Sequence, residues 1–165
     1  MVVVWNDNEI FSTEIGKVFV AVESPLNAPE DSGVLMSFTY EKKFPDTSLR
    51  LTASGDHRSA YKSGYSGCGR WYFLIDGSEC RDPRTIEGVS SFDYLANYHN
   101  SMQVSGVCHN VSSGSREIAY AVGLCSGQLL PTEALTGWIS SFYVFVEELR
   151  LSKSTVCQGS PAHCD

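Results

Sequence analysis

Positive charge is scarce in this sequence. Among its 165 residues, 12 Lys and Arg stand against 19 Asp and Glu, which gives a formal net charge of −7. Binding to nucleic acid or to anionic lipid requires clustered positive charge. The composition therefore argues against a nucleic-acid partner and against a membrane partner.

Long apolar runs, low-complexity blocks and internal repeats are missing as well. The longest apolar stretches stop well short of the about 18 residues that a transmembrane helix needs. The hydrophobic fraction of 42% and the aromatic fraction of 12% are typical of a folded globular protein. We expect one globular β-domain over residues 1–165, with residues 152–165 as a tail closed by cysteines.

The start of the chain shows no secretory leader. Met1 is followed directly by the apolar residues 2–5 and then by the acidic Asp7 and Glu9, without a basic region or a small-residue cleavage site. The six cysteines nevertheless favour disulfides and an oxidising compartment. We expect a mature secreted chain whose leader has been removed; the alternative is a cytosolic protein with free thiols.

Helical periodicity is almost absent, and residues 129–135 are the one weak helix candidate. Short runs of alternating or continuous apolar residues predict strands instead. They lie at residues 17–23, 34–40, 49–54, 71–75, 85–89, 102–107, 118–124 and 142–146. Residues 56–69 are rich in Ser, Gly and Tyr and predict a long surface loop.

The run Trp71–Ile75 is the centre of this pattern. It is apolar on both alternations, which is typical of a strand covered on both faces, and Asp76-Gly77 after it predicts a tight turn. Cys68 and Cys80 flank it. The expected structural core consists of Trp71, Phe73, Trp138, Phe142 and Val144.

Eight to ten strands with regularly spaced turns predict an all-β fold, an antiparallel sandwich or barrel. An immunoglobulin-type sandwich fits poorly, because Trp71 follows Cys68 by only three residues and Gly123 stands where that fold places a tyrosine. We therefore expect a jelly roll.

Catalytic constellations are weak. Asp56-His57 lies near many serines, but it lacks a Gly-x-Ser-x-Gly elbow, and adjacent Asp and His rarely serve one triad. Solvated loop charges are the better interpretation. Glu147 and Glu148 would point to opposite faces of a strand and so would not converge on one glycosidic bond.

Metal and phosphate sites are equally poorly supported. Cys157, His163 and Cys164, with His109 as a remote fourth ligand, match no common zinc spacing, and no acidic loop has calcium-ligand spacing. The glycines at 64, 67 and 69 form no phosphate loop. We expect no catalytic residue, no metal and no cofactor.

Six sequence blocks carry a family resemblance. They are Arg70-Trp71-Tyr72-Phe73, Asp76-Gly77-Ser78-Glu79-Cys80, Pro83 with Ile86-Glu87, Gly106-Val107-Cys108, Val122-Gly123-Leu124-Cys125-Ser126, and Thr136-Gly137-Trp138 leading to Glu147-Glu148-Leu149. Their order and spacing over residues 34–151 resemble the C-terminal globular domain of the collagen triple helix repeat-containing protein family. That family's fold is similar to the jelly roll of complement and tumour-necrosis-factor proteins.

The resemblance implies a secreted, non-catalytic matrix or signalling module that trimerises and binds an extracellular protein or glycan. Receptors of the Wnt–Frizzled type are the partners linked to vertebrate relatives. Two departures stand out: there is no Gly-X-Y repeat, and Cys68 stands where the family has a richer cysteine cluster. The alternative is a small extracellular enzyme or a metal-dependent lectin-like protein.

The even count and the resemblance together predict that all six cysteines are oxidised: Cys68, Cys80, Cys108, Cys125, Cys157 and Cys164. Cys157–Cys164 is the firmest pair. The other four allow three connectivities, among which we favour Cys68–Cys80 with Cys108–Cys125.

Two further expectations concern the surface. The sequon Asn110-Val111-Ser112 lies in a Ser- and Gly-rich turn and predicts an exposed, glycosylated Asn110. Residues 71–75 and 142–146 are apolar on both alternations, whereas a two-sheet sandwich has one interior, so we expect a neighbouring subunit to cover the surplus. The family resemblance implies that the assembly is a homotrimer. The alternative is that residues 2–5 fold over this surface in a monomer.

Overall fold

The structure of the protein is a computed structural model, which describes the backbone of residues 3–5, 8–14, 17–23, 32–60, 67–92, 97–126 and 133–151. Side chains are described within residues 32–58, 67–91, 99–126 and 134–151. This part of the chain contains strands and turns and no helix, and none of it forms a helix with the length and apolar character needed to cross a bilayer.

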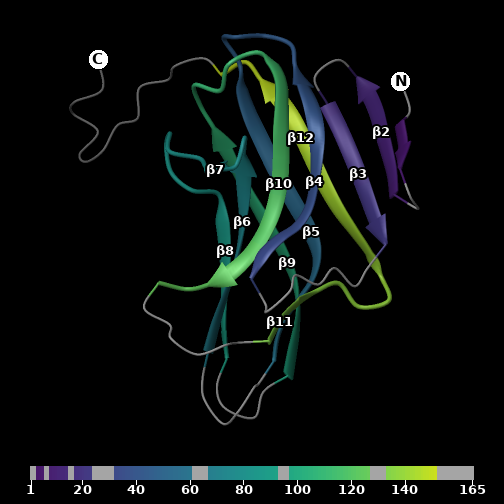
Figure 1. Cartoon of the computed structure of the whole chain (residues 1–165), viewed down its shortest axis with the longest axis vertical. Coiled ribbons are helices and arrows are strands. Elements are labelled where there is room, and N and C mark those ends of the chain that lie inside the picture. Colours follow the sequence, from purple (N-terminus) through teal and green to yellow (C-terminus); the bar gives the residue numbers. More distant parts are fainter. Residues whose placement is uncertain are drawn as a thin grey trace, which may run out of the picture.

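Twelve strands are described (Figure 1). They are β1 (Val3–Trp5), β2 (Asn8–Glu14), β3 (Lys17–Glu23), β4 (Gly33–Lys42), β5 (Ser48–Ala60), β6 (Gly67–Ile75), β7 (Ser78–Glu79), β8 (Glu87–Phe92), β9 (Asn97–Cys108), β10 (Gly114–Leu124), β11 (Glu133–Thr136) and β12 (Ser141–Leu149). The strand positions predicted above agree with this order.

Two antiparallel sheets pack face to face. The large sheet has the order β1-β2-β3-β12-β5-β11, with β9 also pairing β5. The small sheet has the order β4-β10-β6-β7, with β8 also pairing β6. β12 lies between β3 and β5, and β10 lies between β4 and β6, so both sheets contain crossover neighbours. The fold is therefore an all-β, jelly-roll-like sandwich, as expected.

The core lies between the sheets and takes alternate side chains from each. The large sheet contributes Leu49, Leu51, Ala53, Phe142, Val144 and Val146, and the small sheet contributes Tyr40, Trp71, Phe73, Ile118, Tyr120 and Val122. Two polar contacts join the layers inside this core: Trp71 Nε1 donates to Thr136 Oγ1 (2.8 Å), and Tyr120 Oη lies 2.8 Å from His57 Nε2. Burying these polar groups is tolerated because each has a partner.

The favoured disulfide pairing is wrong. The structure joins Cys68 to Cys125 (Cα–Cα 5.5 Å) and Cys80 to Cys108 (5.8 Å). β6 and β10 run antiparallel with Gly69 opposite Leu124, which places the start of β6 beside the end of β10. Cys108 and Cys125 are separated by the full length of β10, about 35 Å of strand, so they do not meet.

Two loop predictions also need correction. The predicted 56–69 loop is largely strand: β5 extends to Ala60 and β6 begins at Gly67, while residues 61–66 lie outside the described part. His57 is fully buried, because it continues the inward series of Leu49, Leu51, Ala53 and Gly55. Of the weak helix candidate at residues 129–135, residues 133–135 lie in β11, and residues 129–132 are outside the described part.

The structure places residues 3–5 differently from the monomeric alternative, in which residues 2–5 fold over the apolar surface. β1 pairs with β2 and β2 with β3, so residues 3–5 extend the large sheet along its edge instead of crossing the face of β12. Cys157, His163 and Cys164 lie outside the described residues, and so does the predicted tail disulfide.

Candidate functional site

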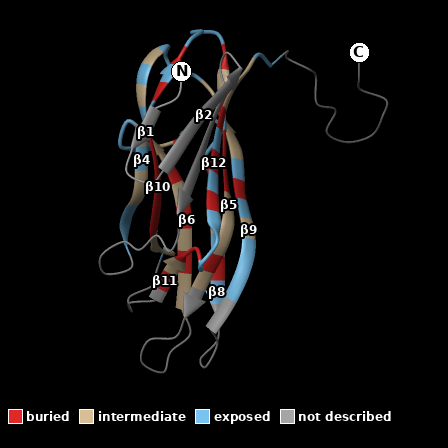
Figure 2. Ribbon diagram, turned by 90° about the vertical axis from the view of Figure 1, so that its right-hand side faces the viewer, coloured by how far each residue is buried: buried red, intermediate tan, exposed pale blue. Residues whose placement is uncertain are grey.

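The outward face of β12 carries aromatic side chains. Buried and exposed positions alternate along this strand (Figure 2). Phe142, Val144 and Val146 are fully buried, whereas Tyr143 and Phe145 are 37% and 38% exposed. β12 lies inside the large sheet, so this is a sheet face and not an edge. The strand is apolar on both faces, but only one of them belongs to the sandwich interior.

Next to this aromatic stripe, the outward face becomes polar. β5 pairs with β9 over its whole length, and four successive outward positions form the cross-strand pairs Thr52–Ser105, Ser54–Gln103, Asp56–Ser101 and Arg58–His99. Thr52 Oγ1 and Ser105 Oγ lie 2.7 Å apart. None of the eight side chains is aliphatic, so this face differs in kind from the neighbouring stripe. We call these eight residues the polar strip.

Trp138 lies at one end of the polar strip. Its indole is 54% exposed, so the prediction that it belongs to the core is wrong. It follows Gly137 in the turn between β11 and β12, where inward–outward alternation does not apply. The ring centroid lies 5.5 Å from the Arg58 guanidinium carbon and 5.1 Å from the His99 ring, which meets it edge-on. The other four predicted core residues, Trp71, Phe73, Phe142 and Val144, are buried.

The backbone of this turn is held in an unusual conformation. Gly137 has φ +80° and donates its N–H to the Asp56 carbonyl (2.7 Å), while Ile139 has φ +39°. A positive φ is costly for a β-branched residue, and Ile139 is 87% exposed, so burial does not offset that cost. Backbone strain of this kind is most often found at functional sites.

Asp56 and His57, which are neighbours in sequence, have separate partners. Asp56 faces outward and its Oδ2 lies 2.6 Å from His99 Nδ1. His57 faces inward, contacts the rings of Trp71, Tyr120 and Phe142, and lies 3.1 Å from the Gly55 carbonyl. They cannot serve one triad, and the interpretation of both as solvated loop charges is wrong for His57.

Ser48 and His109 are a second pair with possible chemistry. Ser48 Oγ lies 2.7 Å from His109 Nδ1. Within the described side chains no carboxylate hydrogen-bonds to this imidazole, so the third member of a triad is missing from this set. Glu147 and Glu148 point to opposite sides of β12, as predicted: Glu147 pairs with Arg50, and Glu148 accepts hydrogen bonds from the β4–β5 turn.

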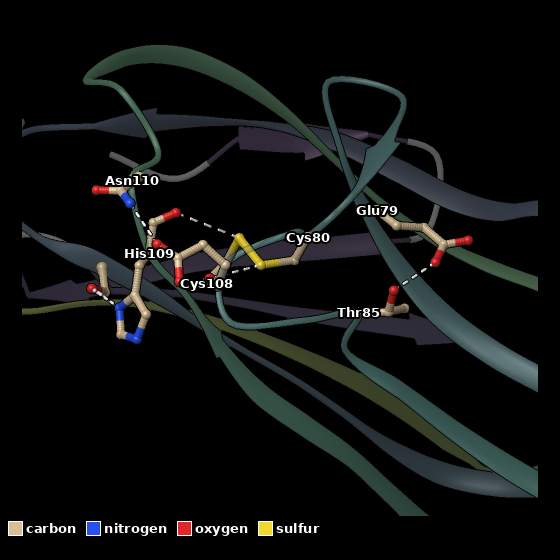
Figure 3. Close-up of a disulfide and its surroundings, with 8 residues drawn as sticks. Glu79, Cys80, Thr85, Cys108, His109 and Asn110 are labelled. Atoms are coloured by element: carbon tan, nitrogen blue, oxygen red, sulfur yellow. Dashed lines mark hydrogen bonds between the residues drawn. A yellow bond between two sulfur atoms is a disulfide. The ribbon is translucent and has the colours of Figure 1, made fainter.

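Figure 3 shows the Cys80–Cys108 disulfide and its surroundings. Both cysteines line a cavity of about 300 Å³. Asn110 lies in the turn after β9 with φ +56°, is exposed, and donates from Nδ2 to Asp82. Nearby, Asp76 binds Arg116 (2.8 Å) and accepts from the Glu117 N–H (2.9 Å). The charges around this cavity are thus largely satisfied by one another.

Among the described residues no three His, Cys, Asp or Glu side chains are grouped to hold a metal ion. Three of the four ligands considered from sequence lie outside these residues, and the fourth, His109, lies beside Ser48.

Residues 21–146 match the family described as CTHRC1, C-terminal domain. The chain belongs to this family. The match covers most of the chain, from β3 to near the end of β12, and it confirms the resemblance to the C-terminal globular domain of the collagen triple helix repeat-containing proteins.

Membership of the CTHRC1 C-terminal domain family has three consequences for the structure described above. The family is related to the extracellular matrix and is not a known enzyme family. Together with the two disulfides, it indicates an extracellular protein. The outward face of the large sheet therefore fits a contact surface better than an active site.

The motifs that carry the family resemblance have different structural roles. Arg70-Trp71-Tyr72-Phe73 is the middle of β6, where Trp71 and Phe73 fill the core and Arg70 stacks over Tyr72 (4.2 Å) on the outside. Thr136-Gly137-Trp138 combines a buried hydrogen-bond acceptor, a turn glycine and an exposed indole. The polar strip was missed from sequence because its strand partners are distant along the chain.

Proposed function

We propose that the protein is a secreted, non-catalytic matrix or signalling module that assembles as a homotrimer and binds an extracellular protein or glycan. Membership of the CTHRC1 C-terminal domain family supports the class of function. The family resemblance suggests receptors of the Wnt–Frizzled type as the protein partners. Asn110 is proposed to carry the glycan that its sequon and exposure allow.

The exposed pair Tyr143 and Phe145 is the observation that carries the assembly proposal. Both lie on a central strand whose other face is already buried. Aromatic residues are enriched at the centres of protein interfaces, and closed cyclic symmetry covers one such face on every subunit. β2 pairs with β3 and β1 pairs with β2, so residues 3–5 lie in line with the large sheet, which supports the assembly proposal over the monomeric alternative.

Light scattering coupled to size exclusion at micromolar concentration tests the proposal. A trimer has three times the 18.1 kDa mass of one chain. A single species at the mass of one chain would remove the assembly part of the proposal. Binding of the purified chain to an immobilised Frizzled cysteine-rich domain, with and without removal of the Asn110 glycan, tests the receptor part.

A further inference from the structure

The Trp138 indole and the polar strip lie on one continuous face. Arg58 and His99 form the last cross-strand pair of the strip, and both contact the indole. The strip runs from Thr52 to Arg58 on β5, about 20 Å at the rise of a strand. It therefore forms a flat ladder of hydroxyl, amide, carboxylate and guanidinium groups that ends at an aromatic platform.

The indole is held in place as a platform. Arg58 lies over the ring, and His99 meets it edge-on while Asp56 fixes the imidazole at 2.6 Å. The strained turn at Gly137 and Ile139 sets the backbone on both sides of Trp138. A side chain held by two neighbours and still 54% exposed loses little conformational entropy when a ligand stacks on it.

Several side chains of the polar strip have hydrogen-bonding groups that are not used by the described residues. Ser101 and Gln103 are exposed on β9, and Ser54 is half-buried beside them on β5. Among the described residues, these three side chains make no hydrogen bond. They share the outward face with Arg58 and His99, the two residues that contact the indole, because outward positions of paired strands lie on one face.

From this juxtaposition we infer that Trp138 and the polar strip form a binding site for a neutral oligosaccharide. The weakly positive C–H face of a pyranose ring would stack on the negative face of the indole opposite Arg58. Its hydroxyl groups, which both donate and accept, match Ser101, Gln103 and Asp56. This inference deepens the proposed function by naming a site and a ligand class.

Charge argues for a neutral ligand. The chain carries a net charge of −7, and the strip combines Asp56 with Arg58, so no positive field selects a sulfated or acidic chain. The strip carries one carboxylate, whereas glycoside hydrolysis requires two flanking the scissile bond. The geometry therefore points to binding without cleavage.

The site adjoins the aromatic stripe proposed for assembly, because Thr52 and Ser54 of the polar strip stand opposite Phe145 and Tyr143. β5 separates β9 from β12, so Ser101 and Gln103 lie two strands away from Tyr143 and Phe145. A trimer contact over β12 and a sugar over β5 and β9 occupy neighbouring halves of one face.

The test is titration of the full chain with cellohexaose, laminarihexaose, chitohexaose, mannohexaose and a heparin hexasaccharide, followed by calorimetry and tryptophan emission. At least one neutral hexasaccharide should bind and perturb the emission. Trp138→Ala should weaken it at least about tenfold, the scale of one aromatic stacking contact. Trp138→Phe should recover part of the affinity, and Gln103→Ala should weaken binding severalfold.

Phe44→Ala is the matched control, because Phe44 is also an exposed aromatic residue under an arginine, with Arg150 5.9 Å from its ring. It should leave sugar binding unchanged, and thermal unfolding of every variant checks that the fold is retained. No neutral hexasaccharide bound at millimolar concentration, or equal binding by Trp138→Ala, would overturn the inference. So would binding of heparin alone, lost with added salt.

Light scattering on the same samples separates this inference from the proposed assembly. A trimer that binds no neutral sugar would contradict the site and leave the assembly proposal standing. A monomer that binds sugar through Trp138 would support the site and contradict the assembly proposal. If Trp138→Ala dissociated a trimer, the indole would be a subunit contact and the inference would be wrong.

Discussion

His57 is an ionisable side chain at the centre of the core. Its imidazole is enclosed by Trp71, Tyr120 and Phe142, and its two ring nitrogens lie at hydrogen-bonding distance from the Tyr120 hydroxyl and the Gly55 carbonyl. Burial lowers the pKa of His57 to about 4, against an ordinary value of 6.5; the Gly55 contact and the nearby Asp56 charge oppose this shift. A neutral imidazole therefore joins the two sheets.

The first prediction is a loss of stability in acid that His57 causes. Its folded-state pKa lies below its unfolded value, so the unfolded chain binds the proton first. The stabilising contribution of neutral His57 to the free energy of unfolding is present above pH 6.5 and is lost as the pH falls towards 4. The full loss is about 3 kcal/mol in the free energy of unfolding. Urea unfolding at several pH values between 7 and 4 measures it.

A substitution isolates this effect from the carboxylates. His57→Gln keeps hydrogen-bonding groups in the core but does not titrate, so its unfolding free energy should be lower at pH 7 and flatter down to pH 4. His99→Gln is the control, because it changes an imidazole on the outward face and leaves His57 in place. If His57→Gln retains the slope of the unsubstituted chain, another group is responsible.

Asn110 gives a second prediction at the residue scale. Its side chain is exposed in a turn, and one of its two amide hydrogens is engaged with Asp82. Expressed in a eukaryotic secretory pathway, the chain should carry a glycan there, and Asn110→Gln should remove it. Peptide mapping after deglycosylation reads the site directly; an unmodified Asn110 in secreted material would contradict the prediction.

Several residue roles could not be predicted from sequence. His57 continues an inward series, but the glycine before it and the serines after it hid the alternation. The disulfide partners depend on which strands are neighbours, and β6 pairs with β10 about fifty residues away. The exposure of Trp138 depends on a turn conformation that composition does not specify.

At the scale of elements, the turn between β4 and β5 is held by β12. The Glu148 carboxylate accepts hydrogen bonds from the backbone N–H groups of Lys43 (2.6 Å) and Phe44 (3.1 Å) and from Thr47 (2.8 Å) and Tyr40 (3.2 Å). Burial alone would raise the pKa of Glu148, but these hydrogen bonds outweigh it and lower the pKa. One side chain thus connects the ends of strands from both sheets.

The third prediction compares two adjacent glutamates. Glu148→Ala removes the acceptor of four hydrogen bonds and should destabilise the fold by about 2–4 kcal/mol. Glu147→Ala removes an exposed ion pair with Arg50 (3.4 Å) and should cost less than about 1 kcal/mol. Urea unfolding at neutral pH gives both values. Equal effects would show that the turn does not depend on Glu148.

Strand positions were the predictable part of these elements. Alternation marks where a chain is half-buried, so β3, β4, β6, β10 and β12 follow from sequence. Strand ends and order do not, because β5 and β9 continue through polar residues where pairing replaces burial. Half of the polar strip (Asp56, Arg58, His99 and Ser101) lies in those extensions, and the pairing of β5 with β9 that assembles the strip had no sequence signal.

At the scale of the whole molecule, the two sheets use their outward faces differently. The small sheet pairs its charges internally, with Arg70 bound to both Glu79 and Glu87. The large sheet presents an aromatic stripe on β12 and a polar strip on β5 and β9. A module with such a divided face can assemble through one half and bind through the other.

The last prediction concerns assembly through β12. Replacing Tyr143 and Phe145 together by Ser changes only outward positions and leaves Phe142, Val144 and Val146 in the core. If three copies meet on this face, the double variant should lose the desolvation of two aromatic rings per subunit and dissociate to 18.1 kDa chains. Its circular dichroism should remain that of a β-sandwich.

Val89→Ser is the control, since Val89 is an apolar residue of the small sheet that is 54% exposed. The mass of the assembly formed by this variant should not change. A double variant that stays trimeric would place the subunit contact on another surface.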